Sequence, residues 1–292
     1  MSEGPNPENW PGNPRPFIDI TGRKSATVEN ELSLDLKTIP PGATVVSFGE
    51  GFSDFAVRLQ EKRPDISVVA IDRLYAHANP KDSPEEIKRK LKTAGFEPQV
   101  WSGNQWSDAP SRASTAEKQP LYIASDLYKL ALADASVDVV YLNHVLEHID
   151  FGKALPELLR VVKENGEIRF GGTPFTIKNK DGKFVLYLGT ITRDTYDGSV
   201  LRGPDSKTFT EGLRTLAAEA DTAMFTYLSQ TDARPEGPAP TLLEIRTLVI
   251  KKGEQPPIFN EKLGALAGRT FRVLPNTLNS DDPRFPYVEL AI

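Results

Sequence analysis

The sequence predicts an α/β fold in which a mostly parallel sheet carries helices on both faces. Between residues 44 and 175, short runs of β-branched and other apolar residues alternate with helical patterns. This alternation is typical of parallel strands joined by crossover helices. The apolar runs are nearly continuous, which indicates strands that are buried on both faces.

The first predicted strand and the turn after it organise the chain. Val45, Val46 and Phe48 form a short apolar run that ends in Gly49-Glu50-Gly51, and a helical pattern follows at once. A second buried run, 68–71, ends in Asp72. Strand, glycine turn, helix, strand and terminal acid is the plan of a nucleotide-binding βαβ unit. Glycines let backbone N–H groups approach a ligand closely, and the acid can accept hydrogen bonds from both hydroxyls of a ribose.

The remaining strands of the parallel sheet follow in order along the chain. Ser83-Pro84 at the start and Gly95 at the end indicate a helix over 83–96. Further predicted elements are a third strand at 121–123, a fourth at 137–142, a helix at 151–162 and a fifth strand at 168–170. A second short run, 99–101, with Asn104 after it, is an alternative third strand.

Beyond Pro174 the pattern changes to predicted hairpins. Asp181-Gly182 stands between two apolar segments and is a hairpin signal. An amphipathic helix at 207–220 precedes two apolar runs, 224–228 and 243–250, which we expect to pair antiparallel at the edge of the sheet.

These patterns divide the chain into three expected parts. They are a proline-rich N-terminal arm at 1–24, a main domain at 25–252 with inserts at about 73–119 and 175–204, and a C-terminal extension at 253–292 packed on the core. Trp10 and Phe17 in the arm favour a strap that docks on the core, and a lid over a ligand site is the alternative.

Composition excludes several classes of function. The 292 residues contain no cysteine, which rules out disulfides, thiolate metal sites and a cysteine nucleophile. The net charge of −5 makes nucleic-acid binding an unfavoured function. No apolar run approaches the ~20 residues of a membrane helix, and the N-terminus lacks the regions of a signal peptide. We therefore expect a cytoplasmic protein that does not enter a membrane.

Four segments in order resemble the class I S-adenosylmethionine-dependent methyltransferases. They are VVSFGEGFSDFA, VVAID, SDLYKLALADASVDVVYLNHVLEHID and ALPELLRVVKENGEIRFGGTP, which together span about residues 43–175. The resemblance implies a Rossmann-like, doubly wound sheet of seven strands, mostly parallel with an antiparallel edge strand. It also favours 121–123 over 99–101 as the third strand, because Asp126 then lies close before the fourth strand, as in the family.

The resemblance implies S-adenosyl-L-methionine as the cofactor and a position for each part of it. The backbone around Gly49 and Gly51 would face the methionine portion, and Asp72 would hold the ribose hydroxyls. Asp126 would accept a hydrogen bond from the adenine amino group. The implied cofactor-binding residues are Phe48, Gly49, Glu50, Gly51, Asp72, Arg73, Ser125, Asp126, Leu127 and Asn143.

Two positions depart from the family pattern. Ser47 stands where the family usually has an acid, two residues before the first glycine, and Ser53 replaces a third glycine. The loss of a carboxylate removes a charge-assisted contact, which is typically the stronger kind of hydrogen bond. These departures motivate an alternative reading, in which the chain is a non-catalytic relative that serves as an interaction or regulatory protein.

His144 is the candidate catalytic residue, because it follows the fourth strand where an acceptor would lie and imidazole titrates near neutral pH. A base is optional, since methyl transfer from a sulfonium mainly needs positioning and exclusion of water. His148 lies one helical turn further on and matches a family histidine that we take as structural, while His77 is assigned no role. No third ligand is evident besides Glu147 or Asp150, so we expect no metal site.

The sequence thus predicts a methyltransferase, an enzyme that moves a methyl group to an oxygen, nitrogen or carbon atom of a small-molecule acceptor. Candidate wall residues of the acceptor pocket, on position only, are Tyr187, Tyr196 and Arg202. An NAD-dependent oxidoreductase is a further alternative, disfavoured because the turn lacks the G-x-G-x-x-G spacing. The acceptor and the oligomeric state are left open.

Overall fold

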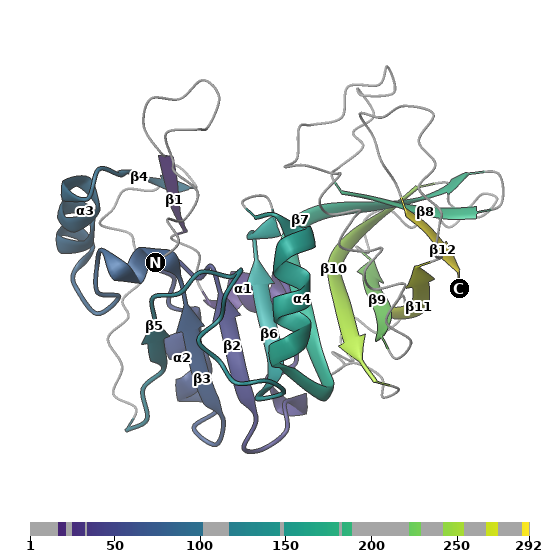
Figure 1. The fold of residues 1–292 in the computed structure, drawn as a ribbon, viewed down its shortest axis with the longest axis horizontal. Helices are drawn as coiled ribbons and strands as arrows, with labels where there is room; N and C mark the ends of the chain where they lie inside the picture. The colour runs from purple at the N-terminus through teal and green to yellow at the C-terminus, as the bar shows by residue number, and fades with distance from the viewer. Residues whose placement is uncertain are drawn as a thin grey trace.

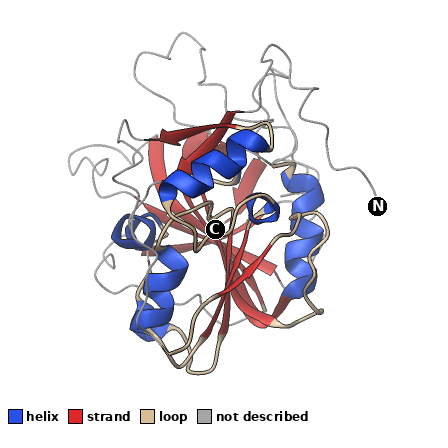
Figure 2. Ribbon diagram, turned by 90° about the vertical axis from the view of Figure 1, so that its left-hand side faces the viewer, coloured by secondary structure: helices blue, strands red, loops and turns tan. Residues whose placement is uncertain are grey.

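The computed structural model of this protein describes residues 17–21, 25–32, 34–101, 117–146, 149–180, 183–188, 222–228, 242–253, 267–273 and 288–291. The expected helix at 207–220 lies outside these residues. Within them, a parallel sheet flanked by helices on both sides passes into a set of antiparallel strands (Figures 1 and 2). None of the helices in this part of the chain combines the length and the apolar character needed to cross a bilayer.

Five parallel strands form the expected α/β sheet. In spatial order they are β5 (Leu121–Ile123), β3 (Ser67–Ile71), β2 (Thr44–Phe48), β6 (Val137–Asn143) and the first half of β7 (Val162–Lys180). A sixth strand, β10 (Leu242–Lys252), pairs antiparallel with β7. The Rossmann-like, mostly parallel arrangement with an antiparallel strand at one side is therefore confirmed.

The expected count of seven strands is not confirmed, because pairing continues past β10 in the described part of the chain. β10 pairs with β9 (Thr222–Leu228), β9 with β11 (Ala267–Val273), β11 with β12 (Val288–Ala291) and β12 with β8 (Lys183–Leu188). β8 in turn pairs with the second half of β7, so that the main sheet contains ten strands. Closing the antiparallel strands on one another leaves none of them as an open edge, which removes a template for aggregation.

The length of β7 makes this junction possible. Its residues 167–171 pair with β6, its residues 175–180 pair with β8, and β10 runs along both halves. The predicted hairpin is confirmed by the pairing of Lys180 with Lys183. The expected antiparallel pair of 224–228 and 243–250 is confirmed as well, although β10 is an interior strand rather than an edge.

The two faces of the parallel sheet bury different helices. On one face, α1 (Ser25–Glu31) and α2 (Phe55–Lys62) pack on Val45, Val68, Val139 and their neighbours. On the other, α4 (Phe151–Val161) packs on a set that includes Val46, Val140 and Leu142. Alternate strand residues enter opposite cores, as the period of two in a strand requires. This explains why the strands read as continuous apolar runs.

The alternative third strand lies outside the main sheet. Residues Glu97–Trp101 form β4, which pairs in parallel with β1 (Phe17–Thr21) of the N-terminal arm as a separate two-stranded sheet. β4 follows α3 (Pro84–Thr93), a helix that Ser83 caps by accepting a hydrogen bond from the backbone N–H of Glu86. β5 is the strand that pairs with β3, as the sequence favoured. Asn104 lies outside the described residues.

Candidate functional site

The glycine turn leaves the carboxyl end of β2 in a conformation that only glycine adopts easily. Gly49 has φ 61° and Gly51 has φ 57°, both in the left-handed region. A Cβ atom at Gly49 would lie 2.4 Å from Cγ2 of Val145, just beyond β6. A larger residue at Gly49 would therefore be strained in its backbone and would clash with Val145. The turn thus lies directly against the segment that follows β6.

Asp72 ties this turn to the end of β3. Its Oδ2 accepts a hydrogen bond of 2.8 Å from the Gly51 N–H, and its Oδ1 accepts one of 2.8 Å from the Leu74 N–H. Burial raises the pKa of this carboxyl, and the two backbone donors partly offset that rise. Each carboxylate oxygen has a second lone pair, so both backbone bonds leave acceptor capacity for further hydroxyl groups.

Glu50, at the centre of the turn, is also buried, with 6% of its surface exposed. Its Oε1 accepts hydrogen bonds from the backbone N–H of Ala56 at 2.8 Å and from the Ser53 hydroxyl at 3.3 Å. Its Oε2 is buried and has no hydrogen-bond partner. Burial is the main cause that raises its pKa to about 7, and the negative charge of Asp72 adds to the rise. The sequence indicated Glu50 only as part of the turn and gave no sign of this burial.

A second cluster lies at the ends of β6 and β7. The Asn143 amide donates to Oε2 of Glu31 at 2.8 Å, and Nε2 of His144 lies 3.4 Å from Oε1 of Glu31. His144 has φ 53°, and a Cβ atom at Gly172 would lie 2.0 Å from the imidazole ring. Left-handed φ at a residue other than glycine is strained and concentrates at functional sites.

Glu31 is the residue of this cluster that sequence reasoning missed. It ends α1 and lies 112 positions from Asn143, so no local pattern links the two. The Thr247 hydroxyl of β10 donates to the Glu31 carbonyl at 2.9 Å and fixes the end of the helix. The Glu31 and His144 side chains are each 25% exposed, so the pair is open to a ligand from solvent.

The predicted adenine-binding residues follow β5, beside the end of β3. The Asp72 N–H donates to the Ile123 carbonyl at 3.2 Å, which holds the two strand ends together. Asp126 is exposed and accepts from the Tyr128 N–H at 3.0 Å, the bond of an Asx turn, while Leu127 is buried. Arg73, directly after Asp72, is exposed. The contact of these residues with a cofactor stays a prediction.

The other positions named from the sequence are less informative. Tyr187 lies in β8 opposite Thr176 of β7. Tyr196, Arg202 and His148 lie outside the described residues. His77 is exposed, and its ring lies 5.0 Å from that of Phe96 in an edge-on contact. The described residues contain no group of three metal-ligating side chains.

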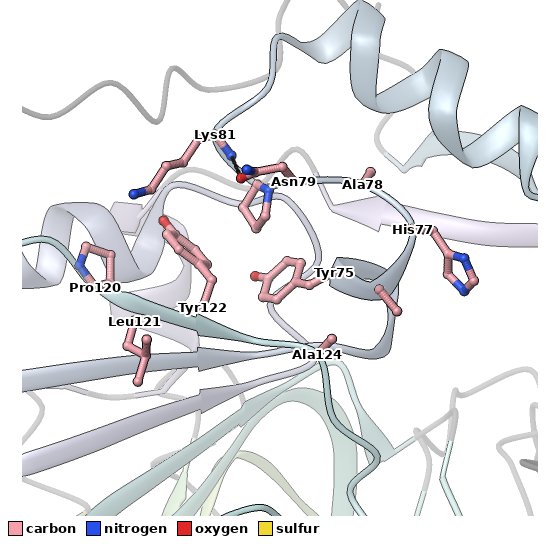
Figure 3. Close-up of a pocket in the computed structure, with 11 residues that line it drawn as sticks. Tyr75, His77, Ala78, Asn79, Lys81, Pro120, Leu121, Tyr122 and Ala124 are labelled. Carbon is pink, nitrogen blue, oxygen red and sulfur yellow. Dashed lines mark hydrogen bonds between the residues drawn. The ribbon is translucent and has the colours of Figure 1, made fainter. Parts of the chain in front are cut away.

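A cavity of about 550 Å³ lies beside the site rather than in it (Figure 3). The segments 75–81 and 120–122, together with Ala124, line it, and Tyr75 and Tyr122 meet edge to face with ring centroids 5.5 Å apart. None of the predicted cofactor residues is in its lining, although Ala124 directly precedes Ser125. The cavity therefore borders the adenine end of the predicted site at the β3–β5 edge.

Several solved structures match this chain at low identity and with TM-scores below 0.5. An S-adenosylmethionine-dependent methyltransferase from Methanosarcina mazei is 13% identical, with 75% of this chain and 96% of that chain covered and a TM-score of 0.38. Geranyl diphosphate C-methyltransferase from Streptomyces coelicolor is 12% identical, with coverages of 78% and 79% and a TM-score of 0.40. A methyltransferase from Mesorhizobium loti is 17% identical, with coverages of 74% and 95% and a TM-score of 0.37. No curated protein matches the chain.

A comparison of the sequence with models of protein families matches one segment of the chain. Residues 100–170 match the family model of the methyltransferase domain. The matched segment contains β5, β6, α4 and the first part of β7, and thus one half of the site described above. The other half, the glycine turn and Asp72, precedes it and is joined to it in the parallel sheet. Over residues 100–170 the chain is thus similar in sequence to the methyltransferase domain.

Proposed function

We propose that this enzyme transfers the methyl group of S-adenosyl-L-methionine to an oxygen, nitrogen or carbon atom of a small-molecule acceptor. One observation carries the proposal: Asp72, at the end of β3, is hydrogen-bonded to Gly51 in the left-handed turn after β2. This bond places the backbone of the turn and a carboxylate side by side, as a ligand with both a ribose and an amino-acid portion requires.

The cofactor would lie across the carboxyl ends of β2, β3 and β5. Its ribose hydroxyls would donate to the remaining lone pairs of Asp72, and its adenine would lie between Arg73 and the 125–127 segment. Phe48, Gly49, Glu50 and Gly51 would surround the methionine portion. In open α/β sheets, ligands bind at this end of the strands.

The acceptor would approach from the ends of β6 and β7, where Asn143 and His144 meet Glu31. We propose His144 as the group that receives a proton from the acceptor, with Glu31 orienting its ring through the 3.4 Å contact. Positioning and exclusion of water supply the rest of the rate enhancement, because the reaction is an in-line displacement at the methyl carbon.

The start of α2 argues against an NAD-dependent oxidoreductase. In dinucleotide-binding folds, the pyrophosphate lies at the N-terminus of the helix after the glycine turn. In this protein the Glu50 carboxyl accepts a hydrogen bond from the Ala56 N–H in the first turn of α2. A pyrophosphate at that place would lose this donor and would meet a like charge.

Calorimetric titration with S-adenosylmethionine and S-adenosylhomocysteine tests the proposal, with Asp72→Asn as the variant. Loss of a charged acceptor for two hydroxyls is expected to weaken binding by roughly 10- to 100-fold. Asp134→Ala is the matched control, because this side chain is 78% exposed and pairs with Arg160 away from the site. It should bind as the wild type does.

Absence of binding by folded wild-type protein would contradict the enzyme proposal and favour the alternative of a non-catalytic relative with an interaction or regulatory role.

We also propose that the arm and the C-terminal extension are accessory parts added to a main domain at 25–252. In this arrangement, the pairing of β1 with β4 and of β11 with β9 joins each accessory part to the main domain. The absence of cysteine and the acidic charge are compatible with the cytoplasmic location and the small-molecule acceptor that we propose.

A further inference from the structure

The Glu50 carboxyl has one oxygen that the protein uses and one that it does not. Oε1 accepts from Ala56 N–H and the Ser53 hydroxyl, and this contact caps α2. The helix N-cap residue, Asp54, makes no side-chain cap of its own. Oε2 is as deeply buried but has no hydrogen-bond partner. Helix capping therefore accounts for Oε1 of Glu50, but it does not account for the buried Oε2.

Neither protonation state satisfies Oε2 within the ligand-free protein. As a carboxylate, Glu50 would be a buried charge without a cation, which is costly. As a carboxylic acid, Glu50 would still leave Oε2 without a formed hydrogen bond. The charged group that acts on it is Asp72, which has the same sign. A positively charged N–H donor would complete the hydrogen bonding of Oε2 and also compensate the buried charge.

We propose that Glu50 binds the ammonium group of the cofactor's amino-acid portion. This inference rests on the proposed function. S-Adenosylmethionine carries two positive groups, a sulfonium and an ammonium. Only the ammonium can donate a hydrogen bond to Oε2, because it has three N–H hydrogens whereas the sulfonium sulfur has none. The ammonium also belongs to the portion of the cofactor that the glycine turn would face.

The neighbouring residues support this assignment. Ser47, at the end of β2, is buried, and its hydroxyl lies close enough to the Glu50 carboxyl to lower the pKa of that group. Glu50 therefore brings a carboxylate to the end of β2, where Ser47 itself has only a hydroxyl. Oε2 is covered in the ligand-free protein, so binding must open the turn around it.

Binding of the ammonium should release a proton. With the pKa of Glu50 near 7, about nine tenths of the carboxyl groups are protonated at pH 6, and a bound ammonium favours the ionised form. Wild-type protein should therefore release close to one proton per ligand at this pH. The affinity should rise as the pH rises from about 5 to about 7 and then level off.

Two adenosine ligands and one variant test the inference. S-Adenosylhomocysteine carries the ammonium, whereas 5′-methylthioadenosine shares the adenosine and thioether but has no amino-acid portion. Glu50→Gln keeps the size of the side chain and the acceptor for Ala56 N–H. We expect it to weaken S-adenosylhomocysteine by roughly 10- to 100-fold, the effect of one charge-assisted hydrogen bond, and to leave 5′-methylthioadenosine within about twofold.

Calorimetry at pH 6 in two buffers of different ionisation enthalpy measures the released proton, which should be absent in Glu50→Gln. Equal weakening of both ligands would show that Glu50 only shapes the turn, and an unchanged affinity for S-adenosylhomocysteine would show that it does not bind the ammonium. Either result overturns the inference while the proposed function stands. A wild-type protein that binds neither ligand would overturn the proposed function with it.

Discussion

Glu50→Gln should change how the stability of the ligand-free protein depends on pH. An unfolded chain titrates this glutamate near 4.5, and the folded protein titrates it near 7 because the carboxyl is buried. Between these values the folded state holds a proton that the unfolded state has released. The raised pKa of Glu50 therefore contributes stability to the folded protein. This contribution is fully present below the unfolded pKa and is lost as the pH rises through the folded pKa.

The size of the effect follows from the two pKa values. The linkage relation gives a loss of about 2.5 kcal/mol between pH 5 and pH 8 for a shift from 4.5 to about 7. The glutamine side chain of the variant cannot ionise, so this loss should appear as a change in the difference between wild type and variant. The comparison cancels the other titrating groups, apart from the coupling with Asp72.

Urea unfolding of both proteins at pH 5 and pH 8 measures this difference. We expect Glu50→Gln to gain about 2.5 kcal/mol on the wild type as the pH rises, and the m-value should stay the same in both. A difference that stays constant within about 0.5 kcal/mol would refute the reasoning, because it would mean that Glu50 is ionised in the folded protein at both pH values.

Two further predictions concern stability and use the same assay. Gly172→Ala should cost more than about 2 kcal/mol, because its Cβ atom would lie 2.0 Å from the His144 ring, whereas Gly42→Ala, with φ 77° and no atom within 4 Å, should cost only about 1 kcal/mol. Adding His144→Ala to Gly172→Ala should reduce the cost to that of Gly42→Ala, and equal costs for the two single variants would contradict the contact. Arg169→Ala should cost about 3–5 kcal/mol, because it removes one partner of a buried ion pair with Glu167 (Nε to Oε1, 2.5 Å). A replacement of both residues by apolar side chains should recover most of that loss, and no recovery would contradict the explanation.

The parallel half of the fold was predictable because its signals are local. Val45, Val46 and Phe48 in the first strand and residues 68–71 in the second are apolar, and the glycine turn and Asp72 stand directly at the strand ends. The antiparallel strands β11 and β12 were not predicted, since strand pairing in the C-terminal segment depends on partners far away in the sequence, β9 and β8. A tail with scattered apolar residues indicates that it packs, but not on which strand.

The candidate site likewise has contacts that local sequence signals predict and contacts that they do not. Asp72 and Gly51 lie 21 positions apart, within one βαβ unit, and the sequence placed them together. Glu31 joins Asn143 across 112 positions, through a helix whose placement no motif marks. Glu50 was found as a position in a motif, but its burial and its unpartnered oxygen depend on how α2 packs behind the turn. Local motifs thus locate a site, while packing decides the charge state of the groups in it.

The charge at the start of α2 is the feature that separates ligand classes on this βαβ plan. A helix N-terminus with free N–H groups attracts an anion such as pyrophosphate. In this chain the helix N–H of Ala56 is already bonded to Glu50, whose second oxygen is left without a donor. We therefore expect this location to favour a cation over an anion. In the proposed binding mode, a ligand would offer an ammonium to Glu50 and ribose hydroxyls to the remaining lone pairs of Asp72, whereas a dinucleotide would have no group suited to Glu50.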